Sequence, residues 1–302
     1  MVAPGLGSLL IGTRSGLHRL GEDPGVELDG HDVGPLVSNG DGWLAIVDGR
    51  SIWRSGPEGW DPLGELPAAE RANCVATSEG APLVGSSKAG LHRMDPTGPR
   101  RVDGFDRTEG REGWYTPWGG PPDSRSIDVD EDGTVYVNVH VGGIPRSRDG
   151  GRSWEPTIDV DADVHQVIAP RPGLVLAATA LGLAISVDGG DTWRLETDGL
   201  HATYCRAVAL SGDVILVSVS RSHRGDRAAL YRRALDAGPF ERCREGLPHW
   251  FDDNVDTHWL AAGEERAAVG TPDGRVFAST DGGSRWDEVA SGLASIRCVA
   301  LA

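Results

Sequence analysis

Short apolar runs alternate with turn residues along the whole chain, and this pattern predicts many short β-strands. The run 9–13 (LLIGT) is followed at once by 16–20 (GLHRL), and the same strand–turn–strand rhythm continues to residue 301. The chain contains 43 Gly and 19 Pro, which suits a backbone that turns often. No apolar run approaches the roughly 20 residues that a membrane-spanning helix needs. We therefore expect an all-β protein with no membrane segment.

An eight-residue frame follows three of these strands. It reads Ser-x-Asp-Gly-Gly-x-x-Trp at 147–154, 186–193 and 279–286. The glycine pair supplies the positive φ of a tight hairpin, the aspartate can accept hydrogen bonds from turn N–H groups, and the tryptophan can pack on the sheet. Each copy therefore predicts one turn of a repeated unit, in which Asp149, Asp188 and Asp281 are structural.

This frame resembles the Asp-box, or BNR, repeat of the sialidase-like and sortilin-like β-propellers and of the photosystem II assembly factors. The resemblance implies a β-propeller, and it says little about activity because one fold serves many functions. Sialidases carry an Arg-Ile-Pro motif near the N-terminus. Here the nearest string is Ile144-Pro145-Arg146, in a different order and in mid-chain. We therefore do not expect sialidase activity.

The strand pattern divides the chain into seven units, at 8–29, 34–66, 73–105, 125–158, 165–196, 205–244 and 258–289. The segment 296–301 remains, and it matches the inner strand that the first unit lacks. We predict one domain, 1–302, folded as a seven-bladed β-propeller of four-stranded antiparallel blades. The C-terminal strand would complete the N-terminal blade and remove an open edge. Six or eight blades are the alternatives.

The charge balance excludes one class of partner. A net charge of −16 makes nucleic-acid binding unfavourable, because a duplex would be repelled by most of the surface. The N-terminal segment 1–10 has no basic region before its apolar residues, so we expect no signal peptide and a cytoplasmic protein. The four cysteines lack metal-ligand spacing, which predicts reduced thiols.

Most of the candidate site residues occupy one aligned position of the inner strands. Two residues before the first core aliphatic of each strand lie Pro35, Asn73, Arg125, His165, Arg206, His258 and Arg297. This register would place three arginines and two histidines at one mouth of the propeller channel. Arginine forks suit carboxylates and phosphates. The alternative is that each arginine pairs with a nearby aspartate, for which Asp163, Asp252, Asp253 and Asp256 are available.

Loops that feed the same face add aromatic and basic residues. We expect Arg125, Arg206 and Arg297 to anchor an anion and His165 and His258 to transfer protons. The further residues expected to line the site are Asn73, Tyr204, Trp250, His140 and His223. Five histidines on this face could lie near one another, namely His140, His165, His201, His223 and His258, which would allow a metal site. No two of them within one element have metal-ligand spacing, so the sequence assigns no metal ligands, leaves a metal as the less favoured alternative and requires no cofactor.

Two functions fit these features. The first is binding of a small anionic ligand, such as a carboxylate, phosphate or sugar acid, by a hydrolase or lyase. The second is a non-catalytic scaffold that binds a protein partner. Enclosed arginines would favour the first function, and an exposed apolar or charged patch would favour the second.

Overall fold

The computed structural model describes residues 5–40, 42–236 and 238–302, and within them the strands form seven four-stranded antiparallel sheets. The fold is a seven-bladed β-propeller, which confirms the predicted class and blade number. Backbone contacts divide the chain into two units, Pro35–Leu195 and the remainder on either side of it. Each unit is described here by itself, and the expectation of one domain over 1–302 stays a prediction.

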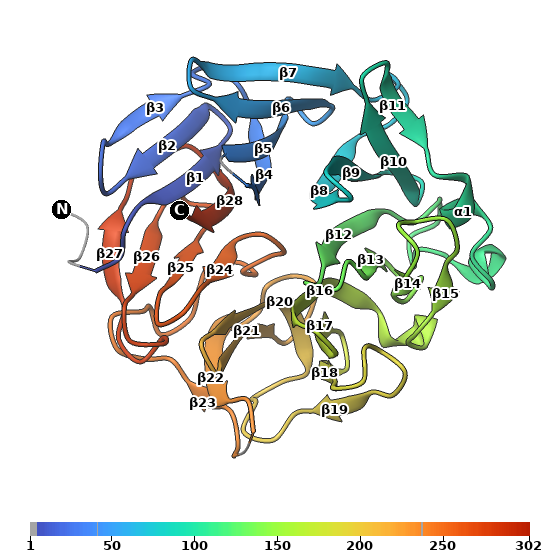
Figure 1. Ribbon diagram of the computed structural model, residues 1–302. Coiled ribbons are helices and arrows are strands. Elements are labelled where there is room, and N and C mark those ends of the chain that lie inside the picture. Colours follow the sequence, from blue (N-terminus) through green and yellow to red (C-terminus); the bar gives the residue numbers. More distant parts are fainter. Residues whose placement is uncertain (1–4, 41, 237) are drawn as a thin grey trace. The chain divides into compact units, whose positions relative to one another are not determined.

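The first unit contains three sheets. In the first sheet β28 (Ile296–Leu301) pairs with β1 (Leu9–Thr13), followed by β2 (Gly16–Leu20) and β3 (Gly25–Glu27). The sixth sheet contains β20 (Tyr204–Ser211), β21 (Val214–Ser220), β22 (Ala229–Ala234) and β23 (Glu241–Arg242). The seventh contains β24 (Leu260–Ala262), β25 (Ala267–Gly270), β26 (Val276–Ser279) and β27 (Asp287–Ala290). Figure 1 shows β28, in red, beside β1, in blue, which confirms that the C-terminal strand completes the N-terminal blade.

The other four sheets form the second unit. The boundary between the units falls within β4 at its start and within β19 at its end. The second sheet contains β4 (Val33–Asn39), β5 (Gly42–Val47), β6 (Ser51–Gly56) and β7 (Gly59–Glu65). The third contains β8 (Ala72–Ser78), β9 (Ala81–Ser86), β10 (Gly90–Asp95) and β11 (Gly98–Arg101). The fourth contains β12 (Ser124–Val129), β13 (Val135–Val139), β14 (Pro145–Ser147) and β15 (Glu155–Pro156). The fifth contains β16 (Val164–Arg171), β17 (Leu174–Thr179), β18 (Gly182–Ser186) and β19 (Arg194–Glu196).

Three short helical segments lie in connections of the second unit. They are α1 (Asp103–Asp106), η1 (Arg111–Gly113) and η2 (Val160–Ala162). None of the helices in the described residues is long and apolar enough to cross a membrane.

The repeated frame forms the hairpin that its residues predict. Both glycines of each copy have positive φ, at 68° and 88° for Gly150 and Gly151. The carboxylate of Asp149 accepts hydrogen bonds from the backbone N–H groups of residues 152 and 153, at 3.0 and 2.9 Å. The carboxylates at the matching positions of the other two copies accept equivalent bonds. These side chains satisfy turn donors, so their role in the fold is structural.

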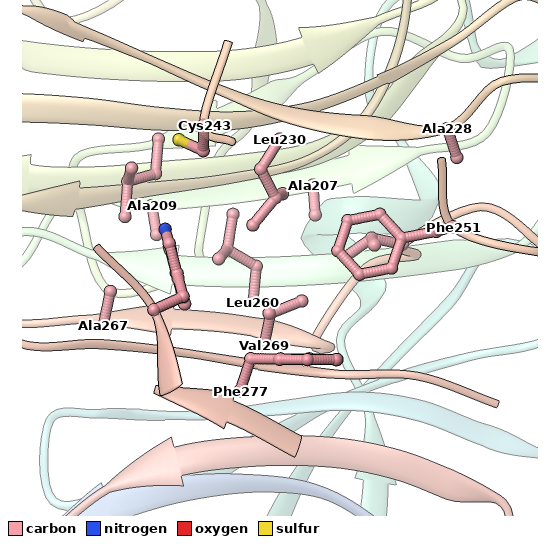
Figure 2. Close-up of a cluster of buried hydrophobic side chains, with 13 residues drawn as sticks. Ala207, Ala209, Ala228, Leu230, Cys243, Phe251, Leu260, Ala267, Val269 and Phe277 are labelled. Atoms are coloured by element: carbon pink, nitrogen blue, oxygen red, sulfur yellow. The ribbon is translucent and has the colours of Figure 1, made fainter. Parts of the chain in front are cut away.

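Apolar side chains fill the spaces between successive sheets. In the first unit, Figure 2 shows Leu230 and Cys243 facing Leu260, Val269 and Phe277 of the next sheet. The tryptophan of the third frame belongs to this cluster, is 1% exposed, and donates its indole N–H to the carbonyl of the second frame glycine at 3.0 Å. All four cysteines are buried and free, in agreement with the expected reduced thiols.

Trp286→Ala should lower the free energy of unfolding by about 3–5 kcal/mol, because it leaves a large cavity in this cluster. Trp118→Ala is the matched control, since that ring is 74% exposed; we expect a change within about 0.5 kcal/mol. Urea denaturation of both variants measures the difference. Equal effects would show that the frame tryptophan does not hold the sheets together.

Candidate functional site

The position singled out in the sequence coincides with a β-bulge in five sheets. In the third sheet the pairing of β8 with β9 shifts between Ala72 and Cys74, which leaves Asn73 as the extra residue. Equivalent shifts occur in the first strand of four more sheets, at Arg125, His165, Arg206 and Arg297. A bulge redirects a side chain and is common beside functional sites. The predicted residues therefore share one local backbone irregularity.

Two of the three predicted anion-anchoring arginines already face carboxylates. Arg206 donates to Asp256 at 2.6 Å, and its side chain is 13% exposed. Arg297 makes a bidentate contact with Asp32, at 2.9 and 2.8 Å. This is the pairing that the sequence left open as the alternative, with Asp256 among the expected partners. A bound anion would have to compete with these carboxylates, and anion anchoring by the two arginines stays a prediction.

The second unit brings together two of the five predicted channel-face histidines. The His140 and His165 rings lie 6.0 Å apart between centroids, and Asp163 lies between them. Asp163 Oδ1 is 3.2 Å from His140 Nε2, and Asp163 Oδ2 is 3.7 Å from His165 Nε2. His140 follows β13, Asp163 follows η2, and His165 is the bulge residue of β16. We call these three residues the His–Asp–His cluster.

The environment of the cluster keeps its carboxylate ionised. Burial by itself raises the pKa of Asp163, but the His140 imidazole, whose Nε2 lies 3.2 Å from the carboxylate, and the positive potential of His165 and Arg125 outweigh it, so the pKa is lowered. Both histidines are buried, at 5% and 0% exposure, whereas the Asp163 side chain is 25% exposed. The Trp118 ring lies 5.0 Å from the His140 ring. The cluster is thus a buried donor set that solvent reaches through the carboxylate.

The remaining predicted site residues lie elsewhere. Tyr204 and Trp250 belong to the first unit, where Trp250 stacks under the Arg242 guanidinium at 3.8 Å and Tyr204 accepts a hydrogen bond from Arg206 at 3.4 Å. His223 is exposed, and the carbonyl of His258 accepts a hydrogen bond from the Val299 backbone. Asn73 lies in the second unit, with a buried amide nitrogen that has no hydrogen-bond partner among the described residues.

The second unit also contains a cavity that was not predicted from the sequence. A cavity of about 710 Å³ lies between the third sheet and the hairpin of the first frame. Five arginines line it together with two carboxylates, and its charged lining residues are Arg93, Arg100, Arg101, Arg107, Arg152, Glu79 and Asp103. We call it the arginine pocket. Three of its arginines fall within eight residues of an otherwise acidic chain, at 100, 101 and 107, and this local reversal of charge was the available signal.

Comparisons with known proteins show the fold. No family model and no curated protein matches the chain. Among solved structures, a GH74 enzyme from Niastella koreensis is similar with a TM-score of 0.62 and 13% identity over 93% of this chain and 47% of that chain. This chain therefore spans about half of that enzyme. A catalytically inactive virginiamycin B lyase from Staphylococcus aureus, with quinupristin, has a TM-score of 0.61 and 10% identity over 93% and 95% of the two chains.

A third similar structure is not described as an enzyme. YCF48 bound to a D1 peptide has a TM-score of 0.54 and 15% identity, covering 82% of this chain and 78% of that one. Enzymes and a peptide-bound protein thus share this propeller fold, and identities this low show the fold alone.

The two arginine–aspartate pairs differ in burial, so comparing them tests how burial changes the strength of an ion pair. A double-mutant cycle of Arg206→Ala and Asp256→Ala should give a coupling energy of about 1–3 kcal/mol, because the guanidinium is largely buried. The Arg297–Asp32 pair has side chains 32% and 37% exposed, so its coupling should stay below about 1 kcal/mol. Thermal and urea unfolding of the two sets of variants give both energies. Equal coupling would contradict the assignment of Arg206 to a buried structural pair.

Proposed function

We propose that this propeller binds a small anionic ligand in the arginine pocket of its second unit. The observation that carries the proposal is the group of five guanidinium groups, against two carboxylates, around one cavity of a protein with a net charge of −16. A positive cavity in a negative surface concentrates anions. The planar guanidinium fork also matches carboxylate and phosphate oxygens.

Hydrogen bonds to neutral groups fix one side of the pocket. Arg93 donates to the carbonyls of Ser78 and Gly150, at 2.8 and 2.9 Å. The nearest carboxylate, Glu79, is 4.0 Å from Arg93 and 3.6 Å from Arg152. One carboxylate therefore lies between two guanidinium groups and leaves an excess of positive charge. The rigid placement of Arg93 lowers the entropy that an incoming ligand would lose in ordering it.

The other side of the pocket carries the more accessible charges. Arg107 is exposed and has no ion-pair partner among the described residues. The side chain of Arg100 is 76% exposed, and its nearest carboxylate, on Asp95, is 4.0 Å away. Arg101, by contrast, is held by Asp106 through two hydrogen bonds, at 2.7 and 2.8 Å. Arg107 and Arg100 are the groups that gain most from an anionic ligand.

The size and lining of the pocket define the class of ligand. A volume of about 710 Å³ lies in the usual range of small-molecule sites, so it accommodates a phosphate ester, polycarboxylate or sugar acid. The described lining residues include two carboxylates, on Glu79 and Asp103, and no histidine, cysteine, tyrosine or serine. The proposal is therefore limited to binding. The hydrolase or lyase activity expected from the sequence is not assigned to this pocket.

Isothermal titration with pyrophosphate, citrate and glucuronate tests the proposal. At least one of these anions should bind, and Arg107→Gln and Arg100→Gln should each raise its Kd by about 10-fold, because each removes a charge-assisted hydrogen bond. Arg171→Gln, which changes an exposed arginine at the end of β16, should leave the Kd unchanged. Added salt should weaken binding to the parent protein.

Two outcomes would overturn this function. Absence of binding by all three anions would remove the small-ligand function. Binding of a poly-glutamate peptide but of none of the small anions would support the scaffold alternative, in which the pocket holds an acidic segment of a protein partner.

A further inference from the structure

Three metal-binding side chains meet in the His–Asp–His cluster, and we infer that His140, Asp163 and His165 bind a divalent transition-metal ion. One ligand atom of each residue lies within 4.8 Å of the other two. The inference is independent of the arginine pocket, because the two sites share no residue. The sequence left a metal among the channel-face histidines as the less favoured alternative and assigned no ligands to it.

The distances are close to those of a metal site. Ligand atoms bound to one tetrahedral zinc ion lie about 3.3 Å apart, given metal–ligand bonds of about 2.0–2.2 Å. In this cluster the two distances from the Asp163 carboxylate to the imidazoles are 3.2 and 3.7 Å. These two distances go to different oxygens of the carboxylate, and the three donor atoms together lie within 4.8 Å of one another. The widest pair would therefore have to close by up to about 1.5 Å to share one tetrahedral ion.

The backbone is irregular at or beside all three ligands. His165 is the extra residue of the bulge in β16. Asp163 itself has a φ of 50°, and Val141, which directly follows His140, has a φ of 47° although its side chain is β-branched and buried. Left-handed conformations of non-glycine residues are unfavourable and cluster at functional sites. The chain thus departs from regular strand geometry where it presents these three side chains.

The donor set selects the type of ion. Two imidazoles and one carboxylate suit zinc, cobalt, iron or manganese, whereas calcium and magnesium prefer all-oxygen sites. Three protein ligands leave at least one coordination position for water or a small molecule. Arg125 lies close enough to Asp163 to help lower its pKa.

The competing explanation is that Asp163 simply interacts electrostatically with the two histidines. Such a contact needs no ion, and it would make the cluster a purely structural element. The two explanations differ in one measurable property, because only a metal site binds cations with affinity that depends on all three side chains.

The experiment is titration of the chelator-treated, full-length protein with zinc chloride and cobalt chloride. We expect one ion per chain by calorimetry, and visible d–d absorption of the cobalt form that reports nitrogen and oxygen ligands. His140→Gln, Asp163→Asn and His165→Gln should each raise the Kd for zinc by at least about 100-fold. His249→Gln is the matched control, because that histidine is exposed and lies in the other unit; it should bind zinc like the parent.

Circular dichroism and thermal unfolding without metal show whether each variant is folded, so that loss of binding is not confused with loss of structure. Pyrophosphate binding provides a second readout, which these variants should leave unchanged. The inference is overturned if the parent binds neither ion, or if the three folded variants bind zinc as tightly as the parent.

Discussion

Hydrogen bonding between β28 and β1 is the interaction on which the first sheet depends, because it joins the two ends of the chain. The other six sheets are each built from four consecutive strands, so their pairing needs only short connections. The first sheet instead pairs Leu9 with Leu301, and closing so long a loop costs more chain entropy than a short connection does. The pairing also covers an edge of β1 that would otherwise present free backbone groups.

Close packing where β1 meets β28 explains why residue 12 is a glycine. A Cβ atom on Gly12 would lie 2.5 Å from the carbonyl oxygen of Val33 and 2.6 Å from the sulfur of Cys298. Neither the backbone nor a buried cysteine can move away cheaply, so only glycine fits. The bulge in β28 occurs at the same place, between the residues paired with Gly12 and Thr13. Strand closure and the placement of Arg297 are therefore parts of one local structure.

Arginine has two different environments in this acidic protein. Where carboxylates are near, as for Arg206 and Arg297, the guanidinium is already neutralised by one aspartate. In the arginine pocket five guanidinium groups meet two lining carboxylates, and Arg93 donates to uncharged carbonyls. Carboxylates outnumber basic residues in the whole chain, 45 to 29, so the pocket lining departs from the average charge. A cavity lined by more guanidinium groups than carboxylates is therefore stronger evidence for an anion-binding site than any single arginine.

The sequence by itself determined the sheets, the frame hairpins and the joining of the chain ends. Strand alternation, Gly-Gly turns and the turn bonds of Asp149 are local, so a short segment contains the information for each. The sequence also identified the aligned position of Asn73, Arg125 and His165, because it recurs in every unit. Only the tertiary structure decided what lies next to that position. Asp163 meets His140, and Arg93 donates to the hairpin carbonyl of Gly150, because successive sheets pack against each other. The distance between two sheets is set by the side chains between them.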